Sequence, residues 1–302
     1  MTMMVTAMMQ PLLQRRFFVS SLLQRASLSS RVETSIDSNG IARIELARPD
    51  KLNSLDLEMF QAIAQQILDL KSDKTVRAVI LSGKGRAFCT GLDIKSMAQK
   101  SPFSTIEKLL ERPVGKSSNL AQDVGYLWRD LPVPVIAVLH GMCFGGGLQI
   151  ALGADFRFCT PDCKLSIMES KWGLIPDMSA SITLRELVRA DVAKELTMTG
   201  RVVEGHEAAS LGLVTRCCED PMAEAERVVA EIISKSPDST AKAKQLFQNT
   251  WVAPEEYCLK VETDLQRQLL VSWNQLAAAG RNFGVNLPYF QRKDGDIGTR
   301  KD

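Results

Sequence analysis

Short apolar runs alternate with helical patterns along most of this 302-residue chain, and this alternation constrains the fold more than any other feature. The runs at residues 76–82 and 132–139 are mainly apolar, as buried strands are. Residues 54–71 instead carry apolar side chains at the three- and four-residue spacing of an amphipathic helix. Strand and helix alternate from about residue 34 to 216, which predicts an α/β core. From residue 221 onward the pattern is helical.

The same periodicity predicts the remaining strands and helices. Further strands are expected at residues 41–46, 155–159 and 165–167, and helices at 120–131, 147–154, 179–188, 223–234, 239–249 and 255–279. Residues 98–119 are polar, contain two prolines and lie between core elements. Such a segment is typical of a mobile substrate loop.

Two glycine-rich turns each follow a predicted buried strand. The first, GKGRAFCTGLDIKSM, has Gly85 and Gly91 before Asp93. In the second, three consecutive glycines open a helix at residues 145–147. Glycines there permit close approach to the backbone and leave free N–H groups at a helix start, where developing negative charge can be held. A tight turn packed against a neighbour is the alternative.

Three motifs, in this order and spacing, resemble the crotonase (enoyl-CoA hydratase/isomerase) superfamily: RAFCTGLDIKSM, PVIAVLHGMCFGGGLQIALGAD and SIMESKWGLIPDMSASITLRELV. The resemblance covers roughly residues 34–285. It implies an α/β, crotonase-like spiral of ββα units at residues 33–220 and a C-terminal helical trimerisation region at 221–290. Residues 291–302 are expected to form a disordered tail. A homotrimer or homohexamer is the assembly that the family implies.

The resemblance also implies an oxyanion hole, formed by the backbone N–H groups of Leu92 and Gly146. These groups would bind the oxygen of an acyl-CoA thioester as it becomes an enolate. Contacts with the substrate or its CoA portion are implied for Lys51, Ala87, Phe88, Asp93 and Gly145. Lys51 is equally compatible with an ordinary solvated lysine.

The side chains that move protons distinguish the reactions of this family. Its hydratases carry one carboxylate two residues after the glycine triplet and another twenty residues later; here these positions are Gln149 and Glu169. An amide does not titrate, so ordinary hydratase activity is put in doubt. Asp177 lies where dienoyl-CoA isomerases of the family carry a second carboxylate and aryl-CoA dehalogenases their nucleophile. It could also be a helix N-cap.

We therefore expect double-bond isomerisation of an enoyl- or dienoyl-CoA in fatty-acid β-oxidation, with Glu169 and Asp177 as proton carriers and Gln149 positioning substrate or water. An apolar lining would raise the carboxyl pKa values, and it is expected from Met168, Trp172, Leu174, Ile175 and Met178. The alternatives are a 2-enoyl-CoA hydratase, a thioester hydrolase, and a non-catalytic acyl-CoA-binding subunit.

Composition argues against other partners. The net charge of +2 gives no basic field for nucleic acid. The sequence contains no run of 18 apolar residues, so no membrane-spanning segment is expected. Seven cysteines without paired CxxC motifs, and only two histidines, predict no metal site. No separate cofactor is expected, because coenzyme A is part of the substrate.

The first 32 residues differ in composition from the rest. They contain four arginines and no acidic residue, and they are rich in Ser, Leu and Met. This composition predicts a mitochondrial transit peptide and hence a location in the mitochondrial matrix. A chloroplast address or a disordered tail would be the alternative.

Overall fold

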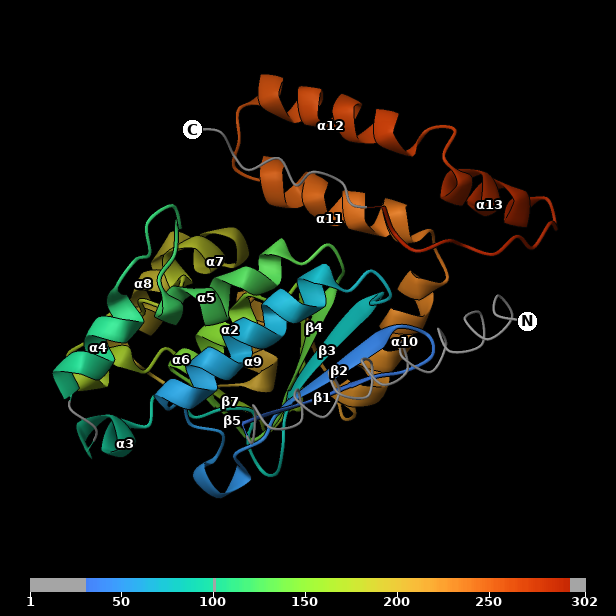
Figure 1. Cartoon of the computed structure of the whole chain (residues 1–302). Helices are drawn as coiled ribbons and strands as arrows, with labels where there is room; N and C mark the ends of the chain where they lie inside the picture. The colour runs from blue at the N-terminus through green and yellow to red at the C-terminus, as the bar shows by residue number, and fades with distance from the viewer. Residues whose placement is uncertain (1–30, 100–101, 294–302) are drawn as a thin grey trace, which may run out of the picture.

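A six-stranded sheet in the order β1-β2-β3-β4-β6-β9 forms the centre of the protein (Figure 1). The computed structural model describes residues 31–99 and 102–293. β1 is antiparallel to β2, and the other neighbouring strands of this sheet are parallel. The strand bounds are β1 Val32–Ile36, β2 Ile41–Leu46, β3 Ala78–Gly83, β4 Val135–Leu139, β5 Met142–Phe144, β6 Phe156–Cys159, β7 Lys164–Ser166, β8 Val203–Glu204 and β9 Arg216–Cys217.

A smaller sheet, in the order β5-β7-β8, stands beside the first. The chain passes from β4 in the large sheet to β5 in the small one, and later from β6 to β7 in the same way. A helix follows β5 directly before the chain returns to the large sheet. This repeated strand–strand–helix path winds the core into a spiral, as predicted.

Both faces of the large sheet are covered, because its strands are apolar on both sides. On β3, Val79 and Leu81 belong to the main core, which α2 and α5 cover, whereas Ala78 and Ile80 face α10 (Figure 1). This alternation follows the two-residue period of a strand. Parallel strands buried on both faces are expected to form continuous apolar runs, and the sequence has them.

The helices lie close to the predicted ranges. Their bounds are α2 Leu57–Ser72, α3 Ile94–Gln99, α4 Pro102–Leu110, α5 Leu120–Tyr126, α6 Gly146–Leu152, α7 Ala180–Leu187, α8 Ala190–Thr199, α9 Gly205–Leu211, α10 Pro221–Ile233, α11 Pro237–Thr250, α12 Glu255–Leu269 and α13 Trp273–Asn282; short 3-10 turns are η1 Pro49–Lys51, η2 Leu127–Asp130 and η3 Glu169–Trp172. Among these helices, none is long and apolar enough to cross a lipid bilayer.

Two predicted segments differ from the structure. Residues 98–119, expected to be a loop, contain α4, because apolar residues such as Ile106 and Leu109 recur at helical spacing there. Residues 255–279, expected to be one helix, are two. Val271 adopts a positive φ of 60° between α12 and α13, and this left-handed residue ends the first helix.

Of the C-terminal helices, α10 packs on the sheet, whereas α11, α12 and α13 stand away from it (Figure 1). Buried polar side chains attach these last three helices to the core. Lys244 on α11 pairs with Asp155 at 2.8 Å and donates to the carbonyls of Trp128 and Val133. Arg292 is buried, and its guanidinium donates to the Lys71 and Asp73 carbonyls. A helical C-terminal region is thus confirmed, and its role in trimerisation stays a prediction.

The boundaries of the folded part differ slightly from those predicted. β1 begins at Val32, and the Arg31 side chain pairs with Asp56 at 2.7 Å, so the last two residues assigned to the leader belong to the core. Likewise, Arg292 falls within the segment expected to be a disordered tail. Residues 1–30 and 294–302 lie outside the described residues.

Candidate active site

The two glycine-rich turns predicted from the sequence lie against each other. The Phe144 N–H donates to the Cys89 carbonyl at 2.9 Å, and the Cys89 N–H donates to the Met142 carbonyl at 3.1 Å. Residues 88–91 therefore run beside β5. A Cβ atom on Gly91 would lie only 3.2 Å from the Gly146 nitrogen. The residue before Leu92 thus touches the start of α6.

Each turn presents a backbone N–H group that donates to no backbone carbonyl among the described residues. Leu55 pairs with this turn through the Gly91 carbonyl and the Asp93 N–H, at 2.8 and 2.9 Å, which leaves the Leu92 N–H on the opposite side. Gly146 is the first residue of α6, where an N–H has no acceptor within the helix. In the described ranges, neither N–H donates to a backbone carbonyl. Such a pair of donors fits a carbonyl oxygen that gains negative charge.

Glu169 places its carboxyl group next to these turns. It begins η3, and a Cβ on Gly145 would lie 3.4 Å from Glu169 Oε1. Oε1 accepts a 2.6 Å hydrogen bond from Gln149 Nε2, whereas Oε2 is buried without a partner among the described residues. Burial raises the Glu169 pKa above its ordinary value, and the neighbouring Asp177 adds to this shift. A carboxyl group with a raised pKa is better suited to accept a proton and return it.

Gln149 is buried on α6 and its orientation is set from both ends. The Met178 N–H donates to Gln149 Oε1 at 2.8 Å, so the amide NH₂ faces Glu169. The amide therefore holds the carboxylate and adds no second titrating group.

Asp177 lies at the edge of the site rather than inside it. Its side chain is exposed, although partial burial of the carboxyl group raises its pKa. The N-cap of α7 is Ser179, which makes no side-chain capping bond, so Asp177 does not cap this helix. Asp177 is close enough to Glu169 to raise the Glu169 pKa.

The expected apolar lining is only partly formed. Met178 is buried and Met168 half-buried, but Trp172, Leu174 and Ile175 are exposed, because the end of η3 and the loop after it lie on the surface. Leu55 is a lining residue that the sequence did not single out. A Cβ on Gly146 would lie 2.8 Å from Met178 Sδ and 3.0 Å from Leu55 Cδ1.

Most residues predicted to contact CoA lie on η1 or in the loop between β3 and α3. Lys51 is exposed on η1, whereas Ala87 and Phe88 are buried and their carbonyls accept hydrogen bonds from Asn53 Nδ2. Asp93 pairs with Arg48 at 2.8 Å. CoA contact at these positions remains a prediction. Within the described residues, no three His, Cys, Asp or Glu side chains gather in a way that could hold a metal ion.

Comparison with known proteins agrees with this architecture. The family model described as enoyl-CoA hydratase/isomerase matches residues 37–275, and the chain belongs to this family. YngF of Bacillus subtilis, described as an enoyl-CoA hydratase/isomerase, is 36% identical over 70% of this chain and 78% of its own length. A carnitinyl-CoA dehydratase of Salmonella typhi is 30% identical over 72% of this chain and 80% of its own.

Solved structures of the family have the same fold. The enoyl-CoA hydratase of Mycobacterium smegmatis superposes with a TM-score of 0.77 at 27% identity, covering 86% of this chain and 98% of that one. The enoyl-CoA hydratase of Thermoplasma volcanium gives 0.74 at 27% identity, covering 84% and 97%. The protein therefore has the crotonase fold predicted from its motifs.

Proposed function

We propose that this protein is an acyl-CoA double-bond isomerase that acts on an enoyl- or dienoyl-CoA. One observation carries the proposal. Glu169 has a buried oxygen with no partner in the described chain, beside two N–H groups that have no internal acceptor. A thioester oxygen bound by the two N–H groups would place the adjacent carbon near this carboxylate.

The reaction then needs only one proton carrier. The Glu169 carboxylate removes a proton from the carbon beside the thioester carbonyl, and the electrons move onto the oxygen held by Leu92 and Gly146. The resulting dienolate takes the same proton back from the Glu169 carboxylic acid at a more distant carbon. The double bond moves and no atom is gained or lost. Asp177, at the rim, is placed to serve a longer dienoyl substrate.

Gln149 argues against efficient water addition. A hydratase must hold and deprotonate a water while it protonates the substrate, which two carboxylates accomplish together. Gln149 accepts from Met178 and donates to Glu169, so it provides hydrogen bonds but no base.

Hydration or dehydration is the second candidate. Relatives at 30% identity are named carnitinyl-CoA dehydratases, and the second N–H of the Gln149 amide can hold a water. In this mechanism Glu169 would act as both acid and base.

The cellular setting is also a proposal. The Arg-rich, acid-free first 32 residues support import into the mitochondrial matrix, and the acyl-CoA chemistry suits fatty-acid β-oxidation. Exposed apolar side chains on α11–α13, among them Trp251, Leu259 and Phe283, support self-association as a trimer or hexamer.

A panel of substrates tests the reaction. The purified protein is incubated separately with crotonyl-CoA, a 3-enoyl-CoA and a 3,5-dienoyl-CoA, and ultraviolet absorbance is followed. Isomerisation brings the double bond into conjugation with the thioester, so the absorbance of the conjugated product rises with the 3-enoyl-CoA and the 3,5-dienoyl-CoA. Hydration removes conjugation, so absorbance falls with crotonyl-CoA. We expect the increase with the 3-enoyl-CoA and the 3,5-dienoyl-CoA. Efficient hydration of crotonyl-CoA would favour the second candidate, and tight CoA binding without any turnover would leave only a binding role.

A further inference from the structure

The loop that carries Leu92 is held at both ends by one turn of the chain. This loop, residues 84–93, connects β3 to α3. At its start, the buried Asn53 side chain donates to the carbonyls of Lys84, Ala87 and Phe88 at 2.9–3.1 Å. At its end, Asp93 pairs with Arg48. Arg48 and Asn53 flank η1, so this turn clamps the loop.

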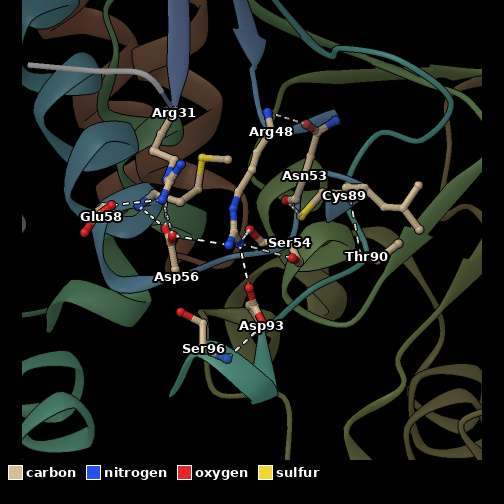
Figure 2. A network of polar contacts seen from close by, with 12 residues as sticks. Arg31, Arg48, Asn53, Ser54, Asp56, Glu58, Cys89, Thr90, Asp93 and Ser96 are labelled. Atoms are coloured by element: carbon tan, nitrogen blue, oxygen red, sulfur yellow. Dashed lines mark hydrogen bonds and ion pairs between the residues drawn. The ribbon is translucent and has the colours of Figure 1, made fainter. Parts of the chain in front are cut away.

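Arg48 stands at the centre of the clamp (Figure 2). Its Nη1 lies 2.8 Å from Asp93 Oδ2 and donates to the Ser54 carbonyl at 3.0 Å, while Nη2 lies 3.6 Å from Asp56 Oδ2. Asp56 in turn accepts from Arg31 and caps α2 through the Met59 N–H. The guanidinium thus links the Leu92 loop to the start of a core helix.

Both carboxylate oxygens of Asp93 have partners, one of which is Arg48. Asp93 also accepts a 3.0 Å hydrogen bond from the Ser96 N–H, which fixes the first turn of α3. Burial alone would raise the Asp93 pKa, but the Ser96 N–H and Arg48 together lower it, so the ion pair persists through neutral pH. The two side chains are only 11% and 13% exposed, so solvent screens them little.

We propose that Arg48 is a positioning residue for the reaction, which acts through Asp93 to hold the Leu92 N–H in line with the thioester oxygen. The inference rests on the proposed function, because it assumes that Leu92 binds this oxygen. The Arg48 guanidinium faces Asp93, Asp56 and the Ser54 carbonyl, and its side chain is only 11% exposed, so the proposed role is indirect. Its effect falls on the charge that develops in the transition state, so its loss lowers kcat more than it raises KM.

Variants of the pair test this role. Removal of one oxyanion donor lowers the rate by about 10²–10³, so a displaced donor in Arg48→Gln should lower kcat by about 10–100-fold with KM changed less than about threefold. Asp93→Asn breaks the same pair and should lower kcat similarly. The double variant should be little worse than either single one, because both remove one interaction. Arg48→Lys keeps the charge and should restore part of the activity.

Arg129 and Glu186 offer a matched control. This pair is also 2.8 Å long, with side chains 11% and 14% exposed, but it joins η2 to α7. Arg129→Gln should lower thermal stability about as much as Arg48→Gln without the loss of kcat. If Arg48→Gln does not fold, Arg48→Lys and Asp93→Asn carry the comparison.

An infrared measurement separates this proposal from the function on which it rests. The stretching frequency of a ¹³C-labelled thioester carbonyl in a bound saturated acyl-CoA reports hydrogen bonding to its oxygen. Wild type should lower the frequency, Arg129→Gln should match wild type, and Arg48→Gln or Asp93→Asn should return it part of the way to the free value. No lowering in wild type would overturn the oxyanion hole itself. Full lowering and normal kcat in the Arg48 and Asp93 variants would overturn only the role of Arg48, as would an equal loss of kcat in the Arg129 control.

Discussion

At the scale of single residues, the amide at Gln149 limits how many proton carriers the site has, and its orientation is fixed by two hydrogen bonds. The Met178 backbone N–H can only donate a hydrogen bond, so the Gln149 atom that faces it must be the amide oxygen. The NH₂ group of the amide then faces Glu169. Of Gln149 and Glu169, only Glu169 then offers a carboxyl group beside the glycine turns. Its second oxygen, without a partner in the described residues, would hold the migrating proton in the proposed reaction.

Gln149→Glu should add hydratase activity. One new oxygen can accept from the Met178 N–H while the other meets Glu169, so the two carboxyl groups must share a proton and can hold a water between them. We expect hydration of crotonyl-CoA to rise by at least about tenfold, within the usual contribution of general acid–base catalysis.

The pH profile of this variant provides a further check. The proposed isomerisation needs ionised Glu169, so its rate in the wild type should rise as pH increases through the raised Glu169 pKa. A second carboxyl raises that pKa again, so the rise in Gln149→Glu should move to higher pH. Gln149→Met, without charge, is the control and should gain no hydration. An unchanged hydration rate in Gln149→Glu would show that position 149 does not face the water site.

The sequence predicted these residues unequally. Glu169 and Gln149 were placed together through motif spacing, and the structure brings them to 2.6 Å. The Arg48–Asp93 pair was not predicted, although Asp93 lies in one of the recognised motifs. Opposite charges 45 positions apart are common in any chain, and only the folded path of η1 beside the loop selects this pair.

At the scale of elements, the contact between two turns builds the site. Gly91 has a φ of 82°, and a Cβ there would lie 2.9 Å from the Phe144 carbonyl oxygen. The loop after β3 and the turn after β5 can approach so closely only because this residue has no side chain.

Gly91→Ala should therefore separate the two N–H donors. We expect a loss of about 1–3 kcal/mol in unfolding free energy from backbone strain, and a fall in kcat of about 100-fold from the displaced donors. Gly115→Ala is a matched control, since Gly115 has a φ of 79° but no atom within 4 Å of a Cβ. In Gly115→Ala, urea unfolding should show a loss of stability from backbone strain, and steady-state kinetics should show an unchanged kcat. Equal effects on kcat would mean that the contact between the turns does not matter.

Element boundaries show what local pattern can and cannot predict. The central strands β3 and β4 were found because they are apolar on both faces, and α2 because its apolar stripe is regular, whereas the edge strands β1 and β9 were not predicted. The break between α12 and α13 was missed because no glycine or proline marks residues 270–272. There the chain turns at Val271, which carries a positive φ that its sequence does not favour.

At the scale of the whole molecule, both the spiral core and the C-terminal helices carry exposed apolar side chains. Exposed aromatic side chains gather on the helical region, including the edge-on pair Phe247 and Trp251 with ring centroids 6.0 Å apart. The loop with Trp172 and Ile175 is exposed as well. Apolar surface of this kind on an isolated chain supports the proposed self-association.

The central claim is that the folded chain brings one carboxylate, Glu169, to a thioester-activated carbon. Exchange of the hydrogens beside the carbonyl of a saturated acyl-CoA in D₂O, followed by NMR, measures this step without any later chemistry. Wild type should exchange them, and Glu169→Gln should be slower by about 10²–10⁴-fold, because an amide cannot accept the proton. Glu33→Gln, at an exposed carboxylate paired with Lys84, should exchange like wild type. Exchange by Glu169→Gln at the wild-type rate would contradict the account.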